Sequence, residues 1–512
     1  MISNKIRVRF APSPTGPLHI GGVRTALYNY LFARHFGGKM ILRIEDTDQN
    51  RYVPGAEQYI IDSLTWTGIE FDEGVHIGGP YAPYRQSDRK DLYRQYADTL
   101  ILSGHAYYSF DTAEELDARR KEAEAEKRVF TYDASVRKGM RNSLALSARE
   151  TKERIESGDP YVIRFLMPEN ATLVFQDMIR GEISVNTHTL DDKVLFKSDG
   201  MPTYHLANIV DDHLMEISHV IRGEEWLPSL PLHILLYRAF GWDPPVFAHL
   251  PLILKPEGSG KLSKRDGDRL GFPVFPLEWK DPFTGDISSG YRETGYFPET
   301  VVNMLALLGW NPGTEQEIFS MDELIKEFSI ERVGKSGSRF DPGKIRWFNH
   351  HYLNSKSIPE LTSLYKDILQ GKGIVADEKY VSKVVEMVKD RSDFVGQFWD
   401  QSYFFFEPPL TYDLELVRKK WKEDTPALLQ GFAKEQETIG EYRAELIKQS
   451  AEAYVQAKGT GLGQLMNPLR LCLVGGGFGP DLALICEMLG KEEVIQRIGR
   501  AIDLFEEKGL IA

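Results

Sequence analysis

The segment that most restricts the fold of this chain lies near its start, where a short strand runs through a turn into a helix. Residues 6–10 alternate apolar and polar side chains, as a strand does. The loop 11–17 contains three prolines and cannot be helical. Apolar residues then recur at helical spacing up to Phe36, where two glycines end the helix. A strand, a tight turn and a helix N-terminus favour a bound phosphate, because backbone N–H groups and the helix dipole point toward it.

Three residues of this turn would suit a nucleotide. Gly21 and Gly22 carry no side chain that would keep a flat base away. His19 can donate a hydrogen bond to a phosphate oxygen. The same residues also fit a simple turn around a buried histidine whose hydrogen bonds are satisfied within the protein. Taken alone, the turn favours this second interpretation.

A cationic segment, Lys261-Leu262-Ser263-Lys264-Arg265, follows much later in the chain. Attack on the α-phosphate of a nucleotide spreads negative charge over the transferring group and the leaving pyrophosphate. Cations positioned there supply most of the catalysis that such a step needs. Gly258-Ser259-Gly260 gives a hinge on which the segment could close. A solvated basic loop is the alternative, since most lysine and arginine clusters are of that kind.

Composition favours a large cytosolic enzyme. The 512 residues suggest roughly three or four domains, and 42% hydrophobic residues are ample for sizeable cores. The net charge of -13 argues against a protein that coats nucleic acid non-specifically. Cys472 and Cys486, the two cysteines, lack CxxC spacing, so neither a disulfide framework nor a zinc site is indicated. No apolar run reaches transmembrane length, and residues 1–5 do not read as a signal peptide.

The order of elements predicts an α/β region followed by a helical one. Strands and helices alternate from residue 1 to about 111 and again from about 203, which indicates a parallel sheet with crossover helices. Residues 112–159 carry dense mixed charge and read as helical, and short strands dominate 161–186, so we expect an insertion with its own fold. Beyond about residue 320 the chain reads as mostly helical.

A basic and aromatic stretch spans residues 331–354. It combines cations with rings, namely Arg332, Lys335, Arg339, Lys344 and Arg346 with Phe340, Trp347, Phe348 and Tyr352. Cations for phosphates and rings for bases fit single-stranded RNA. An interdomain hinge with buried aromatic residues fits equally well.

Several motifs, in this order, resemble those of bacterial glutamyl-tRNA synthetases, a family of class I aminoacyl-tRNA synthetases. They are the segments 9–16 (RFAPSPTG), 43–48 (RIEDTD), 51–57 (RYVPGAE), 202–208 (PTYHLAN), 220–226 (VIRGEEW) and 261–265 (KLSKR). The resemblance extends over nearly the whole chain.

The resemblance implies a fold and a reaction. It implies a Rossmann-like class I catalytic domain in two halves, residues 1–111 and 201–320. An α+β insertion, residues 112–200, would bind the tRNA acceptor end. A stem-contact region together with the first part of the helical region, 321–380, and an all-helical anticodon-binding domain, 381–512, would follow. ATP and L-glutamate would form glutamyl-adenylate, and the glutamyl group would pass to the 3′ end of tRNA-Glu. We expect Mg²⁺ bound by the ATP phosphates, no zinc, no DNA or membrane partner, and a cytoplasmic monomer.

The resemblance also implies roles for particular residues. Catalysis would rest on His19, Lys261 and Lys264. The residues around ATP would be Pro12, His19, Gly21, Gly22, Glu225, Trp226 and Lys264. Glutamate would be bound by Arg9, Ser13, Glu45, Tyr204, Asn208 and Arg222, with Glu45 on its ammonium group. Without the resemblance, Glu45 would read as part of a solvated strand end and Arg222 as half of a surface ion pair.

Two departures from the family and three rival interpretations remain. Some members carry a zinc-binding cysteine cluster where this chain reads Tyr107-Tyr108-Ser109-Phe110-Asp111, and residues 266–289 read as a longer connection than usual.

Glutaminyl-tRNA synthetase would need a β-barrel anticodon part, which the helical C-terminal third opposes. A truncated paralogue that glutamylates a tRNA base lacks a C-terminal domain. A non-catalytic RNA-binding relative would not need His19, Lys261 and Lys264. Whether tRNA-Gln is also charged stays open.

Overall fold

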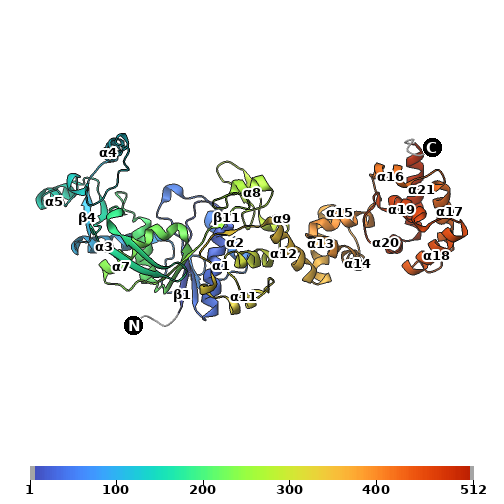
Figure 1. The fold of residues 1–512 in the computed structure, drawn as a ribbon, viewed down its shortest axis with the longest axis horizontal. Coiled ribbons are helices and arrows are strands. Elements are labelled where there is room, and N and C mark those ends of the chain that lie inside the picture. Colours follow the sequence, from blue (N-terminus) through green and yellow to red (C-terminus); the bar gives the residue numbers. More distant parts are fainter. Residues whose placement is uncertain (1–5, 508–512) are drawn as a thin grey trace. The chain divides into compact units, whose positions relative to one another are not determined.

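The computed structural model describes residues 6–507. The prediction that residues 1–5 are not a signal peptide concerns residues outside that range. The chain divides into two compact units, Met1–Ile345 and Arg346–Ala512, coloured blue to yellow and orange to red in Figure 1. The first is a mixed α/β unit and the second is helical, as the sequence predicts. Each unit is described by itself.

The first unit alternates strands and helices. Its strands are β1 (Arg7–Phe10), β2 (Lys39–Leu42), β3 (Glu73–Gly74), β4 (Ala106–Ser109), β5 (Val162–Phe165), β6 (Thr172–Asp177), β7 (Gly181–Asn186), β8 (Val194–Phe196), β9 (His219–Gly223), β10 (Val246–Leu250), β11 (Ile253–Leu254), β12 (Trp279–Lys280), β13 (Ile287–Ser288) and β14 (Ser338–Arg339). Its helices are α1 (Ile20–His35), α2 (Ala56–Trp66), α3 (Lys90–Leu102), α4 (Ala113–Ala125), α5 (Ala148–Ser157), α6 (Tyr204–Leu214), α7 (Leu230–Phe240), α8 (Lys264–Leu270), α9 (Tyr291–Thr294), α10 (Pro298–Leu307) and α11 (Met321–Glu327); α12 (Pro342–Ser355) crosses into the second unit.

Parallel pairing brings the ends of several strands together. One sheet has the order β1-β2-β3 and is parallel throughout, as the alternation of strands and helices predicts. A second has the order β7-β6-β10-β9, in which β6, β10 and β9 run parallel. The two sheets adjoin where the backbone N–H of Ser218, just before β9, donates to the carbonyl of Arg7 at 2.9 Å. In such sheets ligands bind beyond the carboxyl ends of the strands.

Helix α1 is buried on most of its surface, because it packs against the parallel strands of both sheets. Leu27, Leu31 and Ala33 are fully buried, as is Asn29. The Asn29 amide donates to the carbonyl of Ile221 in β9 at 2.9 Å. This bond fixes the position of α1, and so of the turn before it, relative to the end of β9.

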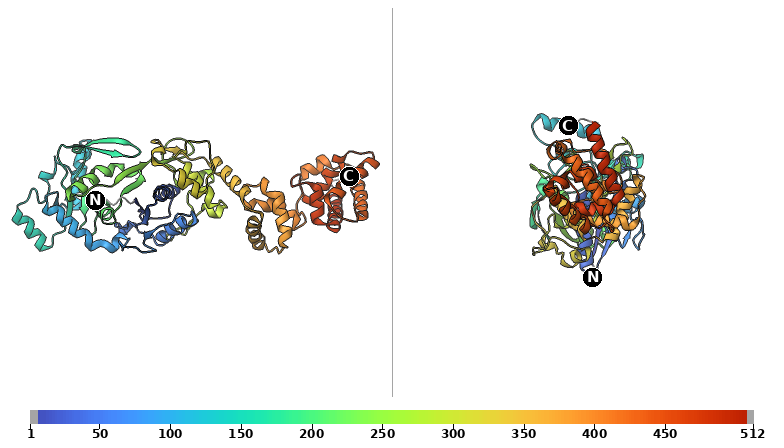
Figure 2. Two further views of the ribbon diagram at one scale, coloured as in Figure 1. Left: turned by 90° about the horizontal axis from the view of Figure 1, so that it is seen from below. Right: turned by 90° about the vertical axis from the view of Figure 1, so that its right-hand side faces the viewer.

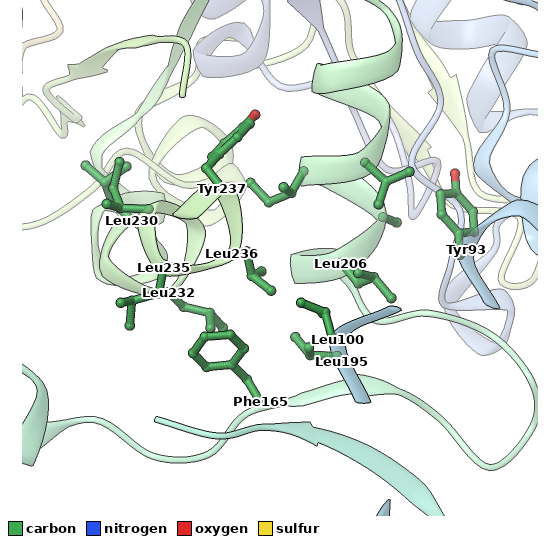
Figure 3. Close-up of a cluster of buried hydrophobic side chains, with 14 of the residues drawn as sticks. Tyr93, Leu100, Phe165, Leu195, Leu206, Leu230, Leu232, Leu235, Leu236 and Tyr237 are labelled. Carbon is green, nitrogen blue, oxygen red and sulfur yellow. The ribbon is translucent and has the colours of Figure 1, made fainter. Parts of the chain in front are cut away.

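A large apolar core lies beside the sheets, between α3, α6 and α7 and the antiparallel sheet β4-β5-β8 (Figure 3). Leu206 of α6, Leu236 of α7 and Phe165 of β5 are buried there. Burial of this kind contributes roughly 25 cal/mol for each Å² of apolar surface removed from water. The core therefore holds α6, which carries Tyr204 and Asn208, against the rest of the unit.

The stretch predicted as a separate insertion shares sheets with its neighbours. The hairpin β6–β7 pairs with β10, and β4 pairs with β5. The expectation of helix throughout 112–159 is wrong for residues 126–147, which are mostly irregular apart from a short turn. Polar side chains order that segment: Asp111 accepts from the Tyr132 hydroxyl and the Arg141 backbone N–H, and the Asn142 amide donates to the carbonyl of Arg137.

The second unit consists of short helices, shown from two further sides in Figure 2. They are α13 (Ile358–Gly371), α14 (Glu378–Val388), α15 (Phe398–Ser402), α16 (Leu414–Lys420), α17 (Thr425–Thr438), α18 (Ala444–Ala457), α19 (Leu462–Val474), α20 (Leu482–Leu489) and α21 (Lys491–Glu507). The apolar periodicity over 436–458 suggests one helix, but the chain leaves the helix at 439–443, where Gly440 weakens it.

The aromatic residues of the basic stretch 331–354 are mostly buried. Phe340, Phe348 and Tyr352 are buried, and Trp347 is about half exposed. A buried ring cannot stack on a base, so these three favour the hinge interpretation over RNA stacking. One guanidinium nitrogen of Arg339 donates to the backbone carbonyls of residues 255, 256 and 258. The Arg339 side chain therefore lies against the loop that precedes Lys261.

Within residues 6–507, every helix is too short or too polar to span a lipid bilayer.

Candidate active site

A cleft of about 590 Å³ opens in the first unit where β1, β9, α1 and α6 meet. Its walls include most of the residues that the resemblance implies for the site: Arg9, Pro12, Ser13, His19, Gly21, Gly22, Glu45, Tyr204, Asn208, Arg222, Glu225, Trp226 and Lys261. Segments more than two hundred residues apart are thus brought together. Lys264 does not line the cleft; it is exposed and begins α8.

His19 caps helix α1 and lines the cleft. Its Nδ1 accepts the backbone N–H of Gly21 at 3.1 Å, so in the neutral ring Nε2 carries the proton. Nε2 is buried and has no hydrogen-bond partner within residues 6–507. Burial, with the charge of Lys261 adding to it, lowers the pKa of His19 to about 4. The interpretation as a satisfied buried histidine is therefore wrong for this atom, which is a neutral donor.

The cationic segment begins beside the cleft, where Lys261 forms an exposed ion pair. The Lys261 ammonium lies 3.0 Å from Oε1 of Glu225. Residues 255–260 form the tip of a hairpin, because the backbone N–H of Lys255 bonds to the carbonyl of Gly260. Ser263 then caps α8 in a capping box with Asp266, which sets Lys264 at the start of that helix.

Glu45 offers one unused carboxylate oxygen. It is only 7% exposed, so the interpretation as a solvated strand end is wrong. Arg43 and Asn208 both donate to its Oε1, at 2.8 and 2.9 Å. Its Oε2 makes no hydrogen bond in the described part of the chain. Glu45 lines the cleft, so this oxygen can accept a bond from a bound cation.

Arg9, which lines the cleft, and the buried Arg43 are both paired with buried carboxylates. Arg9 grips Asp212 with two nitrogens, at 3.1 and 3.3 Å. Arg43 bonds the same Asp212 and also Glu45, each at 2.8 Å. Burial alone would raise the pKa of Asp212, but Arg9 and Arg43 outweigh it and hold that pKa below its ordinary value. Arg9 keeps only Nη1 without a hydrogen bond among the residues described.

Arg222 differs from these, because no carboxylate oxygen lies within 4.0 Å of its guanidinium in residues 6–507. It is 4% exposed, so it is not half of a surface ion pair. Its partners are neutral: Nε donates to His249 at 3.0 Å, and Nη1 donates to the Tyr204 hydroxyl at 2.8 Å. His233 lies 3.4 Å from Nη1, and burial holds the pKa of that imidazole well below 6.5. A buried cation without a counter-ion suits an anionic ligand.

Aromatic side chains form the outer wall of the cleft. The ring of Tyr204 lies 4.4 Å from that of Trp226, which is 41% exposed. Burial raises the pKa of Tyr204, so its hydroxyl stays protonated; it accepts from Arg222 and can donate to a ligand. An exposed ring at the mouth of a cleft can pack against a flat base.

Sequence reasoning missed the residues that hold these groups in place. Asp212 pairs with Arg43 as well as with Arg9. His233 and His249 contact Arg222, and Asp177 is bonded to His249. Their signal was a polar residue inside an apolar run, as His249 is within Val246–Leu254. Such a residue is buried on average, and a buried polar group needs a partner.

The chain is similar to known proteins over nearly its whole length. Residues 5–347 match the family described as tRNA synthetases class I (E and Q), catalytic domain, and residues 360–502 match the family described as anticodon binding domain. Glutamate–tRNA ligase of Porphyromonas gingivalis is 59% identical over 507 residues, covering 98% of this chain and 100% of the relative. Glutamate–tRNA ligase of Christiangramia forsetii is 57% identical over 502 residues, covering 98% of this chain and 99% of the relative.

A solved structure of a glutamate tRNA ligase is also similar to this chain. The crystal structure of a glutamate tRNA ligase from Elizabethkingia meningosepticum in complex with its amino acid has a TM-score of 0.96 and 53% identity, covering 98% of this chain and 99% of the other. The catalytic match spans more than half of the chain, and the relatives match it almost from end to end. The chain therefore belongs to the class I tRNA synthetases and, within them, to the glutamate–tRNA ligase family.

Proposed function

We propose that the cleft binds L-glutamate and ATP side by side and that the enzyme charges tRNA-Glu. The observation that carries this proposal is the pairing, in one cleft, of a free carboxylate oxygen on Glu45 with the unneutralised guanidinium of Arg222. An amino acid with an acidic side chain presents one ammonium and two carboxylates. Glu45 takes the ammonium, and Arg222, with Tyr204 and the free Nη1 of Arg9, takes carboxylate oxygens.

ATP lies along the start of α1 in this proposal. Gly21 and Gly22 let the nucleotide approach the backbone, and Nε2 of His19 donates to a phosphate oxygen. Trp226 packs against the base, and Pro12 lines the same wall. Lys261 and Lys264 bind the phosphates. Because Lys264 lies outside the cleft, it must move toward the cleft to do so.

The first reaction step joins glutamate to the nucleotide. An oxygen of the glutamate α-carboxylate attacks the α-phosphorus, the bond from that phosphorus to the β-phosphate bridge oxygen breaks, and pyrophosphate leaves. His19 and the lysines stabilise the negative charge that grows on the phosphates. In the second step the 3′-terminal ribose hydroxyl of tRNA attacks the acyl carbon, and AMP leaves.

Magnesium enters with ATP in this proposal. The described residues contain no group of three histidine, cysteine or acidic side chains that could hold a metal ion. The phosphates of ATP would carry the ion, as is usual for Mg²⁺.

Charging of purified tRNA-Glu and tRNA-Gln with labelled glutamate tests the proposal. We expect glutamate to be transferred to tRNA-Glu with release of AMP, and glutamine to be rejected. ATP–pyrophosphate exchange, run with tRNA present, measures the first step separately. Transfer of glutamine in preference to glutamate would overturn the assignment of Arg222 to a carboxylate.

A further inference from the structure

A chain of three buried side chains runs from β6 to the cleft. Asp177 ends β6, His249 lies in β10 and Arg222 lies in β9. His249 and Arg222 are register partners across the parallel pair β10–β9, and Asp177 lies on the other side of β10. All three are buried, with exposed fractions of 3%, 0% and 4% in the order named.

The hydrogen bonds along this chain have a defined direction. The Arg222 Nε–H can only donate, so Nε2 of His249, at 3.0 Å, must be the acceptor. The proton of the neutral imidazole then lies on Nδ1, which donates to Oδ2 of Asp177 at 2.6 Å. The other oxygen of Asp177 accepts the backbone N–H groups of residues 179, 180 and 249. The carboxylate is thus fully occupied and cannot swing toward Arg222.

We propose that Asp177 and His249 are positioning residues, which fix the Arg222 guanidinium through a neutral imidazole so that its charge stays available for the substrate carboxylate. This rests on the proposed function, in which Arg222 binds glutamate. A carboxylate placed directly on Arg222, as Asp212 is placed on Arg9, would orient it equally well but would compete with the substrate. The imidazole instead transmits the orientation that Asp177 sets and adds no negative charge of its own.

The tautomer makes the proposal testable. Asp177→Asn preserves shape but puts an N–H₂ donor next to Nδ1 of His249, which drives the imidazole proton to Nε2. Two donors, Nε2–H and the Nε–H of Arg222, then face each other and Arg222 loses its orientation. His249→Asn keeps a donor for Asp177 but removes the acceptor for Arg222, whereas His249→Gln can return an acceptor at the position of Nε2.

The experiment measures steady-state charging of tRNA-Glu by the full-length enzyme, with KM for glutamate and for ATP determined separately. We expect Asp177→Asn and His249→Asn to raise the glutamate KM by roughly 10- to 100-fold, with the ATP KM within about 3-fold of wild type. His249→Gln should recover most of the loss. His219→Gln is the matched control: it alters a partly buried histidine on the same strand as Arg222, outside the cleft, and should leave both KM values unchanged.

Two results would overturn the proposal. One is an equal change of both KM values in the Asn variants. The other is found in a folded Asp177→Asn variant whose ¹⁵N chemical shifts show the His249 proton on Nε2. If the glutamate KM of that variant stays near wild type, the tautomer of His249 does not control Arg222. If a variant does not fold, the ¹⁵N shifts of His249 in the wild-type enzyme still decide, because a proton on Nε2 contradicts the chain of bonds. Failure of the wild-type enzyme to charge tRNA with glutamate would instead refute the proposed function.

Discussion

Arg9 and Arg222 are two buried guanidinium groups in one cleft, and their surroundings give them different tasks. Arg9 shares Asp212 with Arg43, so most of its charge is compensated within the protein. Arg222 is bounded by neutral partners. A compensated charge contributes mainly to the folded structure, whereas an uncompensated one is available to a ligand.

Substitution should separate these two tasks. Arg222→Gln should raise the glutamate KM by about 100-fold, since two charge-assisted hydrogen bonds contribute about 3 kcal/mol, and should also weaken discrimination against glutamine. Arg9→Gln should also act on the folded structure. It should lower the free energy of unfolding by about 3–5 kcal/mol, because Asp212 loses one of its two cationic partners. Charging kinetics and thermal unfolding measure both effects. A glutamate KM near wild type in Arg222→Gln would show that the specificity comes from elsewhere.

His19 provides a test of electrostatics at a single atom. Burial, followed by the charge of Lys261, lowers its pKa to about 4, against 6.5 for an unperturbed histidine. The unfolded chain therefore binds this proton more readily than the folded one, and the free energy of unfolding falls by about 1.4 kcal/mol per pH unit as the pH drops from 6.5 to 4. Above pH 6.5 the group no longer affects stability.

The measurement is a pH titration of ¹³C-labelled histidine by NMR, with the His19 signal assigned by its absence in His19→Asn. We expect no protonation of His19 until well below pH 5.5. A midpoint near 6.5 would mean that the ring is solvated and that Nε2 does not act as a neutral donor.

At the scale of elements, the segment 255–270 combines a hairpin tip with a short helix. Arg339 donates to three carbonyls of the tip, and Ser263 and Asp266 cap α8. These bonds place Lys264 at the exposed start of α8, outside the cleft. A segment that lies outside an active site can move into it during the reaction, as closing loops do in other enzymes.

Lys264→Ala should lower the rate of glutamyl-adenylate formation far more than it weakens glutamate binding, because its cation acts on charge that grows in the transition state. ATP–pyrophosphate exchange in the presence of tRNA gives the rate, and calorimetry gives glutamate affinity. Arg269→Ala, which removes an exposed cation from the same helix, is the control. Equal loss of rate and affinity in Lys264→Ala would contradict its assignment.

At the scale of the molecule, chemistry and RNA reading are assigned to different units. The whole cleft lies within Met1–Ile345, and the anticodon-binding match lies within Arg346–Ala512. The predicted stem-contact region 321–380 contains the division between the units, and its boundaries remain a prediction.

A chain that ends at Ser355 keeps α12 whole and removes the rest of the second unit. We expect it to bind ATP, because the cleft is intact, but to charge tRNA-Glu far more slowly, because the anticodon contacts are lost. Equilibrium binding of a fluorescent ATP analogue and charging kinetics measure the two properties. Charging at the wild-type rate would show that the helical unit has another role.

Zinc is the second test at this scale. The stretch 107–111, where some relatives carry cysteines, contains none, and burial raises the pKa of both Cys472 and Cys486 in α19 and α20. Structural zinc sites need thiolates or imidazoles at four positions. Chelator-washed enzyme should therefore contain no stoichiometric zinc by elemental analysis and should keep its charging activity. One zinc per chain would contradict this expectation.

The sequence by itself determined the elements and the residues with distinctive local signals. Proline and glycine around residues 11–22 forced the turn before α1, and the alternation of strands and helices produced the parallel sheets. These signals are local, because they depend on backbone preferences within a few residues. The resemblance to a known family, and not a local signal, pointed to Glu45 and Arg222, which the fold brings into one cleft with His19 and Lys261.

Only the tertiary structure decided which charges are compensated. Nothing near Arg9 in the sequence points to Asp212, and nothing near Arg222 points to His249 or Asp177, because these contacts join strands and helices that are far apart along the chain. Pairing across β6, β10 and β9 also joined the predicted insertion to the second half of the catalytic region. Charge compensation depends on distance and burial, and both are set by how the strands pair.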